Sequence, residues 1–157
     1  MSLEKFICQS VSEILDGEGA VVKQKIEEHK NIYRDDTAIC FSLLALNEFV
    51  NKNFTAFYQF MNDASFMVEQ SSDSLTKILH ELILGYINFT EKNITLYSIT
   101  YNKARRIAIK NQKTDFFEKI NSILKCPSIA QQHNCHTNQA KVPLVALVNI
   151  GQAVAAE

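Results

Sequence analysis

Apolar residues recur along the first 126 positions at steps of three and four, the spacing that places side chains on one face of an α-helix. The first stripe ends at Asp16-Gly17, where glycine tolerates the left-handed backbone that closes many helices. Its members are Leu3, Phe6, Ile7, Val11, Ile14 and Leu15. Six further stripes predict helices over about 19–33, 36–50, 53–70, 75–91, 93–110 and 115–126, so the pattern indicates seven helices with short joints.

Residues at the expected helix starts support these boundaries. Asn53 and Asn93 carry side chains that can accept a backbone hydrogen bond from the first turn of a helix. Asp115 is followed three residues later by Glu118, which makes a D-x-x-E variant of the capping box. The stripe from about 36 to 50 is apolar on more than one face, and we therefore expect this helix to be central.

Glycine and proline are scarce, which narrows the fold class. Among 157 residues only 4 are Gly and 2 are Pro. β-Sandwiches and barrels need such turn residues every ~8 to 12 positions. The Gly-rich turns of Rossmann and P-loop nucleotide sites have no counterpart in this chain. The sequence therefore predicts an all-α fold, and the length suits one domain.

The chain repeats itself at a spacing of forty residues. The segments LALNEFVNKNFTAFYQFMNDA and LGYINFTEKNITLYSITYNKA superimpose at identical residues. The matched pairs include Leu44 and Leu84, Phe49 and Phe89, Lys52 and Lys92, Asn53 and Asn93, and Ala64 and Ala104. They fall at equivalent places in two helix–turn–helix units, at about 37–73 and 77–113, and such periods are typical of stacked helical repeats.

The second unit resembles a tetratricopeptide (TPR) repeat. Leu84-Gly85 matches the Leu-Gly of that family's first helix, and Lys92-Asn93 lies where its turn does. Tyr101 and Ala104 match the aromatic residue and the alanine of its second helix. The resemblance covers about 37–112 and implies antiparallel helical hairpins that stack as a TPR-like right-handed superhelix.

Two features depart from the family pattern. A position that holds a small residue for close helix packing carries Phe57 in the first unit and Tyr97 in the second. The period is forty residues, whereas a TPR unit has about 34.

In TPR proteins the first helix of each hairpin lines the inner, concave surface. The resemblance implies an apolar groove there, without the lysines and arginines that would clamp a carboxylate. The groove residues carried over by position are Leu46, Phe49, Leu82, Tyr86 and Phe89. The implied partner is an apolar helix or peptide of another protein. The alternative is that flanking helices fill this surface as ordinary core, since buried Phe and Leu are the normal case.

Basic residues cluster in and just after the predicted helix at 93–110. The residues on one helix face are Lys103, Arg106, Lys110 and Lys113. Such a stripe is a candidate patch for nucleic acid or an acidic protein. The net charge of the whole chain is -1, which argues against nucleic acid and favours a solvated outer helix face.

One cluster has residue types that zinc accepts, and it consists of Cys126, His133, Cys135 and His136. Its spacing misses the paired ligands of structural zinc sites, so we predict no bound metal. No paired carboxylates, catalytic triad or cofactor fingerprint is present in the sequence. We therefore expect no enzyme activity and no cofactor, and an active site assembled from distant residues is the least favoured hypothesis.

The chain changes character after residue 126. Residues 127–142 are polar and predict a loop, and 143–157 form an apolar segment whose pattern fits a helix or a strand. This segment is too short to span a membrane. We expect that it packs into the groove of the helical domain 1–126, associates with another copy in a homo-oligomer, or is the start of a further region.

These features together predict a non-enzymatic helical repeat module that binds a protein or peptide through an apolar concave groove. The alternative function is a regulatory or nucleic-acid-binding domain that uses the basic stripe at 103–113. Four scattered cysteines and no signal-peptide pattern favour a cytoplasmic location.

Overall fold

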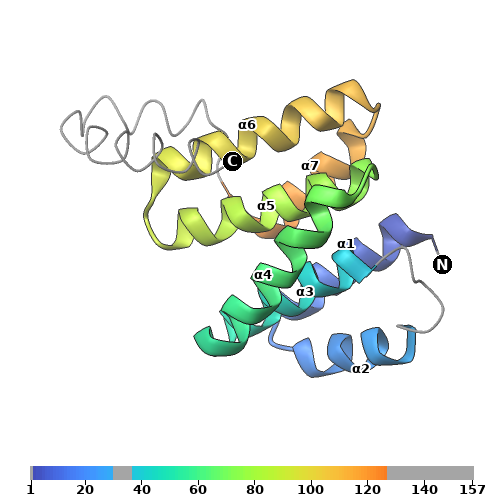
Figure 1. Ribbon diagram of the computed structural model, residues 1–157, viewed down its shortest axis with the longest axis vertical. Coiled ribbons are helices and arrows are strands. Elements are labelled where there is room, and N and C mark those ends of the chain that lie inside the picture. Colours follow the sequence, from blue (N-terminus) through green and yellow to red (C-terminus); the bar gives the residue numbers. More distant parts are fainter. Residues whose placement is uncertain (1, 30–36, 127–157) are drawn as a thin grey trace.

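The computed structural model describes residues 2–29 and 37–126, and these residues form seven α-helices and no strand (Figure 1). The helices are α1 (Leu3–Leu15), α2 (Gly19–His29), α3 (Thr37–Val50), α4 (Phe54–Gln70), α5 (Ser74–Thr90), α6 (Ile94–Lys110) and α7 (Thr114–Leu124). The predicted all-α class and the seven helices are confirmed. The predicted loop 127–142 and apolar segment 143–157 lie outside the described residues, as does the expected end of the second helix near residue 33.

No helix in the described ranges is long and apolar enough to cross a membrane.

Helix length explains the forty-residue period. Helices α4, α5 and α6 have 17 residues each, and joints of three residues at 51–53, 71–73, 91–93 and 111–113 separate the helices from α3 to α7. Two such helices with two joints make a unit of forty residues. Each helix with its joint is therefore about three residues longer than half of a TPR unit of about 34 residues.

Three of these joints have the same backbone conformation. Lys52, Lys92 and Gln112 are left-handed, with φ angles of 61°, 62° and 57°. In each joint the N–H of the following residue donates to the carbonyl oxygen five residues earlier, over 2.7–2.9 Å. This is the Schellman arrangement, which satisfies carbonyl groups that a helix end would otherwise leave unpaired. The Lys-Asn that the two repeat units share therefore ends one helix and begins the next.

The joints also decide where the helices start. Asn93 caps α6 as expected, because its Oδ1 accepts from the N–H of Leu96 over 3.5 Å, whereas Asn53 precedes α4 without a side-chain bond. The predicted capping box of Asp115 and Glu118 is wrong. Helix α7 begins at Thr114 with Lys113 as its N-cap, because the third residue of the joint takes that place as Asn53 and Asn93 do.

The two repeat units form helical hairpins, in which α3 packs against α4 and α5 packs against α6. Helix α5 also contacts α3, α4 and α7, and in Figure 1 the helices α6, α5 and α4 follow one another from top to bottom. A Cβ atom on Gly85 would lie 3.1 Å from the Thr100 hydroxyl and 3.4 Å from the Tyr97 ring. The small residue of this contact, Gly85, is thus on the first helix of the hairpin, and the aromatic ring of Tyr97 on the second helix faces it. Ala45 and Phe57, the equivalents in the first unit, are also buried.

Helix α1 closes the face formed by the first helices of the hairpins. It packs against α3 and α7, which lie on either side of α5. Its buried side chains include Ile7, Val11 and Ile14, all part of the main core. Ion pairs of 3.1 Å join Glu4 to Lys113 and Glu13 to Lys25. Because these pairs are partly exposed they contribute less than about 1 kcal/mol each, so apolar burial holds α1 in place.

The left-handed joints give a first prediction. Replacing Lys92 by Gly will raise the free energy of unfolding by about 1 kcal/mol, because a side chain at positive φ carries a penalty that glycine lacks. Replacing Lys119 by Gly, at an exposed position inside α7, will lower it by about 1 kcal/mol. Urea unfolding of both variants measures the difference. Equal effects of the two substitutions would contradict this account of the joint.

Candidate functional site

The five residues of the expected concave groove lie on the face that α1 covers. Leu46, Phe49 and Leu82 are buried in the main core. Tyr86 and Phe89 are half-buried and pack against that core. In the described fold a partner could therefore reach Tyr86 and Phe89 but not the other three.

A small hollow of about 360 Å³ remains at one end of this face. Tyr86 lines it from α5, together with the ends of α1 and α7. The other lining residues are Ser12, Leu15, Asp16, Ile123, Leu124 and Lys125. The Tyr86 ring lies 6.2 Å from the Phe49 ring in an edge-on arrangement, which fixes Tyr86 against the core.

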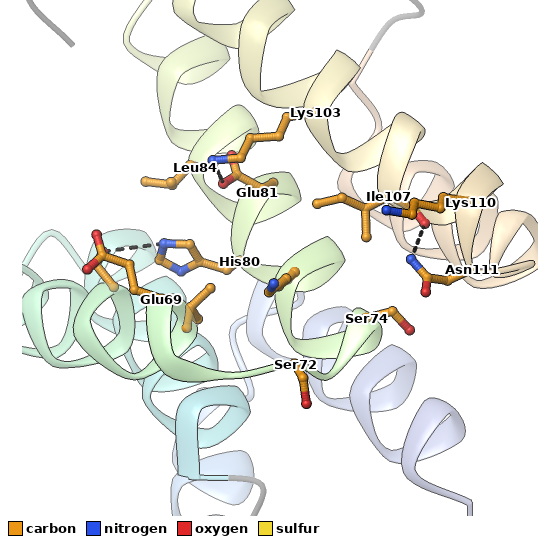
Figure 2. A pocket seen from close by; sticks show the side chains of 13 residues that line it. Glu69, Ser72, Ser74, His80, Glu81, Leu84, Lys103, Ile107, Lys110 and Asn111 are labelled. Carbon is orange, nitrogen blue, oxygen red and sulfur yellow. Dashed lines mark hydrogen bonds and ion pairs between the residues drawn. The ribbon is translucent and has the colours of Figure 1, made fainter. Parts of the chain in front are cut away.

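A larger cavity of about 560 Å³ opens between α4, α5 and α6, and we call it the polar cleft (Figure 2). Its lining residues are Ser65, Val68, Glu69, Ser72, Ser74, Lys77, His80, Glu81, Leu84, Lys103, Ile107, Lys110 and Asn111. The three helices contribute residues three or four positions apart, which share a helix face. The cleft is thus formed by one face of each helix.

An ion pair links two walls of the polar cleft. Lys103 Nζ on α6 lies 3.1 Å from Glu81 Oε1 on α5. Glu81 is buried, whereas Lys103 is partly exposed, and Figure 2 shows the two side chains meeting between the helices. A buried carboxylate needs such a partner, because burial disfavours an isolated charge.

His80 forms part of the cleft wall nearest to α4. It is only 4% exposed, and its Nε2 lies 3.3 Å from the Ser65 hydroxyl. Nδ1 has no hydrogen-bond partner among the described residues. Burial lowers the pKa of His80 to about 4, and the positive charge of Lys103 adds to this effect. His80 is therefore neutral at pH 7.

The contact between Ser65 and His80 has the composition of a nucleophile and its base, but its chemistry is weak. A histidine with a pKa of about 4 is a poor general base at neutral pH. In catalytic triads a carboxylate orients the histidine through Nδ1, and here Nδ1 has no partner within the described chain. The arrangement is suited to binding a polar group.

The basic stripe is divided by the fold. Lys103 pairs with Glu81, and Lys113 pairs with Glu4 on α1. Arg106 and Lys110 are exposed, and Lys110 lines the polar cleft. Two of the four expected cations are thus partly neutralised by carboxylates.

The candidate metal ligands are separated by the limit of the described residues. Cys126 is buried, and burial raises the pKa of its thiol to about 11, so it is not a ready thiolate ligand. His133, Cys135 and His136 lie outside the described residues. Residues 2–29 and 37–126 contain no group of three side chains that could hold a metal ion.

Comparisons of this chain with protein-family models, with curated proteins and with solved structures find no match.

The buried histidine predicts a pH dependence of stability. The unfolded chain protonates His80 below about pH 6.5 but the folded chain only near pH 4, so stability falls as the pH drops through this range. The loss from this residue is about 3 kcal/mol. Urea unfolding between pH 7 and 4 will show a shallower fall in the His80→Gln variant. The same fall in both proteins would contradict a buried neutral histidine.

Proposed function

We propose that this chain is a non-enzymatic binding module, made of TPR-like hairpins, that binds a peptide segment of another protein along α4. One observation carries the proposal: the face of α4 that lines the polar cleft continues beyond it into exposed aromatic side chains. Tyr58 lies two helical turns before Ser65 on the same face, and Phe54 lies one turn before Tyr58. Phe54 is 46% exposed and Tyr58 is 63% exposed.

This surface has the properties of a recognition site. Exposed aromatic side chains often dominate the binding energy of protein interfaces. The cavity volume of about 560 Å³ is within the range of ligand sites. With 17 residues α4 is about 25 Å long, which is long enough to contact an extended peptide over several residues.

The burial of the concave face supports a binding surface along α4, because it leaves little of the concave face for a partner. Helix α1 occupies the face on which the resemblance placed the partner, and three of the five expected groove residues belong to the core. The outer surface of α4, α5 and α6 therefore offers more accessible side chains to a peptide. The weak base at His80 favours binding over catalysis.

The alternative function is a nucleic-acid-binding or regulatory domain that uses the basic stripe. It has less support, because Lys103 and Lys113 are engaged with carboxylates and the net charge of the chain is -1. A phosphate-binding patch requires clustered positive charge that is free to displace counterions.

A matched pair of variants tests the proposed site. Tyr58 and Phe66 lie on the same helix and are both 63% exposed, but Phe66 does not line the cleft and lies about 80° around the helix from Tyr58. Peptides selected from a displayed random library against the full chain serve as probes, and fluorescence anisotropy gives their dissociation constants. Tyr58→Ala will weaken binding about tenfold, and Phe66→Ala will change it by less than about twofold.

The opposite pattern would overturn the assignment. If Tyr58→Ala leaves the affinity of every selected peptide unchanged, the face of α4 is not the binding surface. If Tyr86→Phe reduces affinity and Tyr58→Ala does not, the partner binds at the concave face beside α1. Both substitutions alter partly or fully exposed side chains, so circular dichroism should show unchanged folding.

A further inference from the structure

The charged side chains of the polar cleft indicate the chemistry of the group that it binds. We propose that the cleft holds an oxyanion, the carboxylate or phosphate group of a ligand, between Lys77 on α5 and Lys110 on α6. This deepens the proposed function and rests on it for the source of the anion, which is the bound peptide segment. The binding of the anion itself stands on the geometry of the cleft.

The cleft has more positive than negative side chains. Three lysines and two glutamates line it, and Glu81 is paired with Lys103. In the described part of the chain neither Lys77 nor Lys110 forms an ion pair. Figure 2 places Glu69 near His80 at the α4 wall, on the opposite side of the cleft from Lys110. Two lysines from different helices, neither in an ion pair within the described ranges, thus line one cavity.

The wall formed by α6 strengthens this positive potential. Helix α6 contains four basic residues and no acidic residue, although the whole chain has a net charge of -1. Lys110 lies in its last turn. Only Lys103 and Lys110 of these four line the cleft, and Lys103 is paired with Glu81, so Lys110 is the lysine that this wall offers to an anion.

Neutral polar groups complete the site. Ser72 and Ser74 line the same end of the cleft as Lys110 and can donate hydrogen bonds to an oxyanion (Figure 2). Asn111 lies there too, and it donates one N–H of its amide to the Ile107 carbonyl oxygen over 2.8 Å, which leaves the second N–H for an anion. The N-terminus of α5 is already capped by Asp73, whose Oδ2 accepts from the N–H of Thr76 over 3.1 Å. The attraction for an anion therefore comes from the lysine side chains and not from the helix end.

His80 supplies a second, independent sign of a polar ligand. Its side chain is more than nine-tenths buried in the cleft wall, and Nδ1 is unpaired among the described residues. Buried polar atoms in native proteins nearly always have a hydrogen-bond partner. When Ser65 donates to Nε2, Nδ1 carries the proton and is a buried donor whose acceptor must come from outside the described residues.

Titration of the full chain with free anions tests the proposal without any peptide. Inorganic phosphate and acetate are added in separate experiments at constant ionic strength, and two-dimensional ¹H–¹⁵N NMR spectra follow the backbone amides. We expect saturable shifts confined to residues 72–80 and 107–111. Lys77→Gln and Lys110→Gln will each weaken binding about fivefold. Arg106→Gln removes a neighbouring exposed charge of α6 and will leave the affinity within about twofold.

The outcomes separate the anion site from the peptide site. If the shifts do not saturate, the effect is a general one of charge and the proposal is overturned. The same holds if Arg106→Gln weakens anion binding as much as Lys77→Gln and Lys110→Gln do. Tighter binding of phosphate than of acetate identifies a phosphorylated ligand, and the reverse identifies a carboxylate. If free anions do not bind but Tyr58→Ala still weakens peptide binding, only the oxyanion site is refuted. If free anions bind but Tyr58→Ala leaves peptide affinity unchanged, only the peptide surface is refuted.

Discussion

The packing of α1 against α3 and α7 is the contact on which the rest of the structure depends. Nearly all of α3 is buried, including the consecutive residues Leu43, Leu44 and Ala45, which lie on different sides of the helix. A helix that is apolar all round must be covered on every side. Helix α4 covers one side and α5 another, and α1 with Ile7, Val11 and Ile14 covers the third. Without α1 the first helices of the hairpins would expose a broad apolar face to water.

Closure of that face leaves the polar surface on the other side of α5 as the open part of the molecule. There the fold retains features that a core would exclude, namely the ion pair of Glu81 with Lys103, a buried histidine with an unpaired nitrogen, and a cavity of about 560 Å³. Burying such polar groups is unfavourable unless they have partners. Their presence at one cavity, beside the exposed Tyr58, is the physical basis for assigning binding to this side.

The helices could be predicted from the sequence because each has a strong local signal. The stripe that ends at Asp16-Gly17 and the shared Lys-Asn joints mark boundaries that the structure reproduces. The start of α7 could not be predicted, because the joint around Gln112 sets it and not the side chain of Asp115. The polar cleft was missed for a different reason. Its residues are single polar positions on three mainly apolar helices, and only packing brings them together, although the spacing of Lys77, Glu81 and Leu84 was a weak signal.

Native-state hydrogen exchange of α1 is the most direct test of the view that the concave face is permanently closed. If α1 is part of the core, the amides of Val11 and Ile14 will exchange only through global unfolding, with the same free energy as the slowest amides of α3 and α5. If instead α1 opens at a free energy lower by about 2 kcal/mol or more, it is a detachable segment. The concave groove would then be available to a partner, and assigning binding to the outer surface would be wrong.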